Sequence, residues 1–474
     1  MKSEMQHRTR HWSVVATLLF CFSILTVDLQ SQVVSAQSPR ASNGAAYPAT
    51  APNTPDLDVP LTLSAAVDLA LKQNLDIQIA NIDTAMRQQD RDIARSALLP
   101  TASFEADDSV NRHNLRALLG IEIPISSVPH NIGPYQAVHV GPMFAVPVFD
   151  LTLVRQYQAS GHRVQASLAD EQTVREETVL LTVSEYMAHL RSLASITAAK
   201  SRVELATRLA HQADDLLKDG VASRIDVSRS QVRLREEQQR LVDAQRDADT
   251  TLYALKRIMN VPDSAQIGFA DQQDFFRTPS FDTPDPLTTA LVLRPELHSL
   301  TERIKAAQSA HQAAVAESTP RLNFNGFWNE QGQTFNTSAP GYQYQVAMSV
   351  PIFTGGRLSA ERRSTALAEQ RAQKQFVQER NLVVEQVRDG QVELQAALHQ
   401  VELGREEVLL AHEEVLLSQG RFQSGVTDNI EVTAAQDSLA RANDAEIGAL
   451  FRYNIARAEL ARAAGTIELT YAHP

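Results

Sequence analysis

Residues Gly220–Leu234 read GVASRIDVSRSQVRL, and residues Gly425–Leu439 read GVTDNIEVTAAQDSL. The two runs carry glycine, valine, isoleucine, glutamine and leucine at the same places, and Asp226 in the first matches Glu431 in the second. In each run a glycine is followed by apolar residues at helical spacing, a pattern typical of one helix ending and another beginning. The chain is therefore expected to contain two similar helical hairpins that turn at Gly220 and Gly425.

The similarity between the two parts of the chain extends beyond these turns. A repeat of roughly two hundred residues is far longer than a solenoid unit, and it predicts an internal duplication with structural repeats at residues 58–283 and 284–470. The matching pairs include Ala70-Leu71 with Ala290-Leu291, Pro100 with Pro320, and Val146–Phe149 with Val350–Phe353.

Two long stretches without proline predict the extent of the hairpins. Proline is absent from Val148 to Val261 and again from Ile352 to His473, and proline interrupts helices. We therefore expect helical hairpins at about 151–260 and about 355–465, each with a first arm of about 60 residues, or roughly 90 Å.

The returning arm of each hairpin has coiled-coil spacing. Alternate steps of three and four from Val227 to Ile258, and from Val432 to Ala463, meet mostly apolar or small residues. This 3.5-residue period predicts a left-handed coiled coil, although an ordinary amphipathic core helix is the alternative. The charged run Arg235–Arg240 is interpreted as a solvated helix face with some i,i+4 pairing.

Two segments with a period of two predict β-hairpins at about 101–149 and about 321–353. Tyr342, Tyr344, Val346 and Met348, for example, alternate with Gln343, Gln345, Ala347 and Ser349. Such alternation fits a transmembrane strand and a half-buried soluble strand equally well. If the strands enter lipid, several chains must combine them, because four strands cannot close a barrel and an open edge leaves backbone groups unpaired.

The first residues of the chain resemble a secretory signal. Lys2, Arg8 and Arg10 precede the apolar run Trp12–Val27 and the small residues before Gln37, so residues 1–36 are predicted to be a signal peptide; a membrane anchor is the alternative. Residues 37–57, rich in Ala, Ser, Pro and Asn, predict a flexible leader.

Composition excludes several classes of function. The chain has 474 residues and a net charge of −12, which argues against nucleic acid as a partner. The only cysteine, Cys21, lies in the expected signal, so disulfides and thiol catalysis are not expected. His412-Glu413-Glu414 lacks the second histidine of a zinc-protease helix. We therefore predict no enzyme, and no catalytic, cofactor-binding or metal residues.

Several short motifs follow one another at characteristic distances: Leu61–Asn74, Leu98–Pro100, Ser318–Pro320, Val350–Arg357 and Gly425–Val432. In order and spacing, they together resemble the outer membrane efflux protein family, the TolC-like channels. The resemblance implies a mainly α protein with a small β part. Three copies would form an α-barrel from the helical hairpins and a shared 12-stranded β-barrel from four strands each, with a mixed belt near Phe269–Thr283 and the C-terminus.

The same resemblance implies a location and partners. The protein would be the passive exit duct of a tripartite efflux or type I secretion system in a Gram-negative outer membrane. Its partners would be two further copies of itself, a periplasmic adaptor (membrane fusion) protein, an inner-membrane pump and outer-membrane lipid. A soluble periplasmic coiled-coil scaffold is the alternative, and the sequence leaves the cargo open.

The resemblance also implies a gate at the hairpin tips. Asp226 and Glu431 lie six residues after their turn glycines, and Phe422 lies three residues before Gly425. Three copies of each acid would form a ring that favours cations. The alternative is that both acids are N-terminal helix residues favoured by the helix dipole. Gly220 and Gly425 are expected to act only as turn formers.

Overall fold

The computed structural model describes residues 60–114, 131–220, 223–281, 284–424, 426 and 429–472, except for the side chains of Phe335, Phe422, Gln423 and Asn429. All of them belong to one compact unit, Thr54–Pro474. The predicted signal peptide and leader lie outside the described residues.

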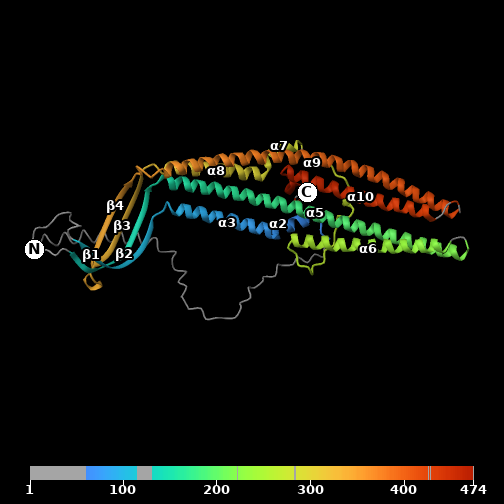
Figure 1. Cartoon of the computed structure of the whole chain (residues 1–474), viewed down its shortest axis with the longest axis horizontal. Helices are drawn as coiled ribbons and strands as arrows, with labels where there is room; N and C mark the ends of the chain where they lie inside the picture. Colours follow the sequence, from blue (N-terminus) through green and yellow to red (C-terminus); the bar gives the residue numbers. More distant parts are fainter. Residues whose placement is uncertain are drawn as a thin grey trace, which may run out of the picture. The chain divides into compact units, whose positions relative to one another are not determined.

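The first part of the unit contains two short helices, two strands and a long helical hairpin (Figure 1). The long arm of the hairpin exceeds the predicted length of about 60 residues, because no proline or helix-ending glycine interrupts it before Gly220. The elements are α2 (Leu63–Gln73), α3 (Leu75–Ser96), β1 (Thr101–Asn114), β2 (Asn131–Phe149), α5 (Leu151–Lys218) and α6 (Arg224–Ile258).

The second part has elements of the same types in the same order, followed by a short C-terminal helix. The 3-10 helix η1 (Asp274–Phe276) lies in the connection between the two parts. Internal duplication predicts such an order, and the duplication itself stays a prediction. The elements are α7 (Pro286–Leu293), α8 (Pro295–Ala316), β3 (Arg321–Gly332), η2 (Phe335–Thr337), β4 (Ala339–Ser349), α9 (Arg357–Gln423), α10 (Asn429–Ala463) and α11 (Ile467–Tyr471).

Each returning arm buries the face that the 3.5-residue spacing predicted. Val227, Leu255 and Ile258 are buried in α6, and so are Val432 and Tyr453 in α10. The arms pack as α6 on α5 and α10 on α9, and both hairpins end at the same end of the unit (Figure 1). The structure thus contains one helical hairpin in each part of the unit.

The four strands form one antiparallel sheet in the order β1-β2-β3-β4. It lies at the end of the helices opposite the hairpin tips (Figure 1). β1 and β4 are the two edges, and neither has a second neighbouring strand among the described residues. Both predicted β-hairpins are present within a single sheet.

The second β-hairpin ends earlier than the alternation predicted. Val146–Phe149 lies within β2, where it pairs with β3, but β4 stops at Ser349 and leaves the matching residues Val350–Phe353 outside the strand. Ile352 and Phe353 are 97% and 89% exposed. The difference comes from the place where β3 begins. Arg321, the first residue of β3, pairs with Ser349, so Val350–Phe353 lies beyond the end of its partner strand, whereas a register shift lets Phe149 of β2 still pair with Leu322.

A buried core joins the two hairpins midway along the helices. It includes Tyr186 from α5, Leu255 from α6, Phe275 from η1 and Leu450 from α10. The Tyr186 hydroxyl donates to the Leu61 carbonyl oxygen at 2.9 Å and contacts the Asp271 carboxylate at 3.1 Å. This core holds both coiled coils against one set of connecting loops.

Candidate functional site

Asp226, the first predicted gate residue, caps the start of α6. Its carboxylate accepts hydrogen bonds from the Ser223 backbone N–H at 3.0 Å and from the Ser223 hydroxyl at 2.5 Å, which forms a capping box. These hydrogen bonds lower the pKa of Asp226. The structure thus gives Asp226 a local role at the helix end, which is close to the alternative reading of this residue as a helix N-terminal acid. Its role in a gate stays a prediction.

Glu431, the second predicted gate residue, lies in the first turn of α10. Its carboxylate forms an ion pair with Arg421 on α9 at 3.5 Å, across the turn of the hairpin. The Phe422 backbone lies in α9, but the Phe422 side chain and Gly425 lie outside the described residues. The gate assignment of Phe422 and the turn assignment of Gly425 are therefore untested.

Gly220 follows the end of α5 with a φ of +74°. Glycine adopts this left-handed conformation without the steric cost of a Cβ atom. No atom lies within 4 Å of the place where a Cβ would be built, so the backbone conformation alone explains the glycine. This geometry fits the turn predicted at Gly220.

A buried ion cluster connects the two hairpins above the turns. Glu237 on α6 is 2% exposed and forms ion pairs with Arg202 on α5 at 3.3 Å, Arg233 at 2.9 Å and Arg240 at 2.9 Å. Arg202 also pairs with Asp444 of α10 at 3.0 Å, and Arg233 pairs with Asp437 of α10. We call these six residues the inter-hairpin ion cluster.

The interpretation of Arg235–Arg240 as a solvated helix face is wrong for Glu237. The coiled-coil ladder from Val227 places Glu237 at a core position, and the structure buries it there. Arg233 and Arg240 lie one helical turn from Glu237, but Arg202 lies on another helix, so a search for i,i+4 pairs finds only part of the cluster. The signal was a carboxylate at a position of the ladder where apolar or small residues are the rule.

The sheet has one apolar and one polar face. Strand pairing aligns Ala102, Phe144, Gly326 and Tyr344 in a row across the four strands. Phe144 lies within 5.6 Å of Phe324 and 5.9 Å of Tyr344, measured between ring centroids. A Cβ on Gly326 would come within 2.3 Å of the Phe144 ring, so the glycine lets the ring lie flat on the backbone.

The opposite face is polar, because neighbouring residues along a strand point to opposite sides. The adjacent row aligns Thr101, Ala145, Asn325 and Gln345. Glu105 and Asp107 of β1 lie on this polar face. On the apolar face, Asp108 lies midway along β1 and accepts a hydrogen bond from Gln136 at 2.9 Å, and Glu330 lies near the end of β3 away from the helices. The part of that face next to the helices has no acid. Met143 and Phe327, which pair with each other, are large apolar residues on the polar face. Amides of β3 and β4 also lie there: Asn323, Asn329, Gln331 and Gln343.

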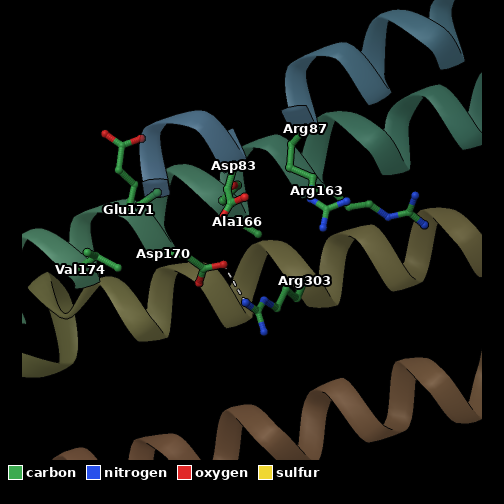
Figure 2. A pocket seen from close by; sticks show the side chains of 10 residues that line it. Asp83, Arg87, Arg163, Ala166, Asp170, Glu171, Val174 and Arg303 are labelled. Carbon is green, nitrogen blue, oxygen red and sulfur yellow. Dashed lines mark hydrogen bonds and ion pairs between the residues drawn. The ribbon is translucent and has the colours of Figure 1, made fainter. Parts of the chain in front are cut away.

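A pocket of about 600 Å³ forms a hollow between α3, α5 and α8 (Figure 2). Figure 2 shows side chains of both signs around it, with Asp170 paired to Arg303 at 2.7 Å. The hydroxyl of Ser167 in its lining lies 3.2 Å from the hydroxyl of Thr84. The arrangement fits a charged groove between packed helices.

The described residues contain neither a candidate metal site nor a candidate membrane-spanning helix. No group of three or more His, Cys, Asp or Glu side chains there is placed to hold a metal ion. None of the helices in the described ranges is long and apolar enough to span a membrane.

Sequence comparison identifies one family. The model of the family described as "Outer membrane efflux protein" matches residues 66–261 and 287–466. These ranges contain both helical hairpins and all four strands. No protein of curated function matches the chain.

Structure comparison finds the same arrangement of elements in several solved structures. A membrane protein from Pseudomonas aeruginosa has 18% identity and a TM-score of 0.76, with coverage of 85% of this chain and 93% of that one. The CmeC outer membrane channel of Campylobacter jejuni has 18% identity and a TM-score of 0.73, with coverage of 85% and 86%. The MtrE outer membrane channel of Neisseria gonorrhoeae, in its open state, has 17% identity and a TM-score of 0.71, with coverage of 85% and 89%.

Proposed function

Since the chain belongs to the outer membrane efflux protein family, we propose that three copies of it form one passive exit channel across the outer membrane. Each copy would contribute its four strands to a shared 12-stranded barrel. The family match favours this channel over the soluble scaffold that the sequence left as an alternative.

The observation that carries the proposal is the two-faced sheet with open edges. Its apolar face, with Phe104 70% exposed, Tyr342 72% and Met348 71%, suits contact with lipid. Its polar face, with the amides of β3 and β4, suits a water-filled interior. Edge strands β1 and β4 would pair between neighbouring copies, so that no backbone group is left unpaired in the hydrocarbon.

The helices offer a second pair of edges for the same assembly. α3 packs on α5, α5 on α8 and α8 on α9, so α3 and α9 are the outer members of one layer (Figure 1). On α3, Ile79, Ile82 and Met86 are 56%, 60% and 60% exposed at helical spacing. On α9, Leu367 and Val377 are 63% and 51% exposed. Two apolar edges of this kind suit a head-to-tail contact that closes into a ring.

We also propose the tripartite arrangement that the family resemblance implies. The hairpin tips would point into the periplasm, and a periplasmic adaptor would join them to an inner-membrane pump that supplies the energy. The ring of Asp226 and Glu431, with Phe422 nearby, would narrow the tip of the tunnel. Three copies of both acids at one constriction favour cations.

Conductance across a planar lipid bilayer tests the proposal. Purified full-length protein is expected to open discrete, cation-preferring channels. The double variant Asp226→Asn with Glu431→Gln is expected to weaken the cation preference or raise the conductance. An asparagine at 226 keeps a side-chain oxygen that can accept from the Ser223 N–H. The control Glu236→Gln, an exposed acid on the same helix, should leave both unchanged. A protein that opens no channel contradicts the function, whereas a double variant identical to wild type contradicts only the gate.

A further inference from the structure

A second cluster of charges lies where α5 meets the start of α8, the end of α10 and α11. Its ion pairs link the four helices: Arg462 with Glu296 at 2.9 Å and with Glu177 at 3.1 Å, and Arg175 with Glu468 at 2.6 Å. Arg294, which is 1% exposed, pairs with Glu296 at 2.9 Å. We call this group, with Glu176, the Glu176 junction.

Glu176 differs from every other acid in the junction. Its side chain is buried, with 4% exposure. Its Oε2 atom is buried without a hydrogen-bond partner among the residues that the structure describes. An ionised carboxylate is costly in such a place unless it is paired, and a protonated one costs much less.

The charges of the junction balance without Glu176. Three arginines face three glutamates that are already engaged in ion pairs, so an ionised Glu176 adds a surplus negative charge. The three arginines are Arg175, Arg294 and Arg462, and the three glutamates are Glu177, Glu296 and Glu468.

We propose that Glu176 is a proton-operated switch. Protonated, it allows α11 and the end of α10 to stay packed on α5; ionised, it favours their release. The packing that would be released is apolar, because Ile467 and Tyr471 of α11 lie in one buried cluster with Val179 and Val183 of α5.

The direction of titration supports this switch. The pKa of Glu176 is raised from 4.5 to about 7, chiefly by burial and next by the charge of Glu296. Arg462 and Arg294 lower it, and Glu468 raises it. These four groups belong to the start of α8, to α10 and to α11. Each helix that closes the junction therefore changes the pKa of the Glu176 carboxyl.

The sign and size of the effect follow from linkage. The closed junction binds more protons than the open one between pH 4.5 and 7, so opening becomes easier as pH rises through this window and levels off above it. If the carboxyl regains its ordinary pKa of 4.5 in the open junction, the opening equilibrium rises about twentyfold from pH 5.5 to pH 7.5.

Hydrogen exchange of the full-length protein in detergent, corrected for the intrinsic effect of pH, tests the proposal. Peptides from the end of α10 and from α11 are expected to open about twentyfold more often at pH 7.5 than at pH 5.5 in the wild type. Glu176→Gln should abolish this pH dependence, because glutamine does not titrate. The matched control Glu171→Gln, on the same helix, should keep it.

Two results would overturn the switch: a wild-type protein whose opening does not depend on pH, or a Glu176→Gln variant that keeps the wild-type dependence. If Glu176→Gln does not fold, Glu296→Gln replaces it. Because Glu296 raises the pKa of Glu176, its removal should make the opening equilibrium level off at a lower pH than in the wild type. An unmoved curve in Glu296→Gln would equally overturn the proposal.

Discussion

Glu237→Gln should destabilise the protein through the inter-hairpin ion cluster. The change keeps the size of the side chain but removes the charge that Arg202, Arg233 and Arg240 share at 2.9 to 3.3 Å. The cluster then holds three positive charges and only two negative ones, those of Asp437 and Asp444.

The expected cost follows from the burial of each partner. Removal of one partner from a buried ion pair costs about 3–5 kcal/mol. Here Arg202 and Arg233 keep one aspartate each, which reduces the penalty, and Arg240 is 46% exposed, so its pair contributes little. We therefore expect a loss of about 2–4 kcal/mol.

Urea unfolding followed by circular dichroism measures this loss as the shift in midpoint multiplied by the wild-type slope. The neighbouring change Glu236→Gln is the matched control, because Glu236 is 53% exposed and pairs only at 3.4 Å with Arg233. It should cost less than about 0.5 kcal/mol. If the two variants unfold at the same urea concentration, the inter-hairpin ion cluster does not hold the hairpins together.

Three further changes have expected outcomes. Tyr186→Phe removes the hydroxyl that reaches Leu61 and Asp271 and should cost about 1–2 kcal/mol in urea unfolding; no change would mean that these hydrogen bonds contribute nothing. Gly326→Ala should displace the Phe144 ring and lower the yield of heat-resistant assembly on a gel, whereas the exposed control Gly420→Ala should not. The wild type should lose up to about 3 kcal/mol of stability as pH rises from 4.5 to 7, and Glu176→Gln should not show this loss. Parallel curves of stability against pH for variant and wild type would contradict the raised pKa.

The sequence predicted the elements of this fold because their signals are local. A proline-free stretch, a glycine at φ +74° and a 3.5-residue ladder each report on neighbouring residues, and they located both hairpins. Alternation likewise located the four strands. It placed the end of β4 too late, because a strand ends where its partner strand ends. The alternation within β4 does not show where β3 begins.

The functional residues were harder to predict because their partners are distant in sequence. Glu237 meets Arg202 from another helix, and Glu176 owes its environment to Glu296 and Glu468. Neither meeting has a fixed spacing along the chain. The sequence singled out Asp226 by its distance from Gly220, and only the structure shows that it forms a capping box with Ser223.

The shared barrel is tested most directly by cross-linking between strand edges. The two edges of one sheet are separated by three strand spacings, about 14 Å, so a shorter cross-linker joins β1 to β4 only between copies. Cys21 is first replaced, and each chain then receives two cysteines, one at Ser103 of β1 and one at Gln345 of β4. A small set of neighbouring pairs on the same face is made in the same way. Such pairs should give covalent trimers on a denaturing gel. The control pair at Ser103 and Asn325 of β3, an inner strand, should give none. Membrane-inserted protein that yields only single chains at every edge pair would contradict a barrel built from three copies.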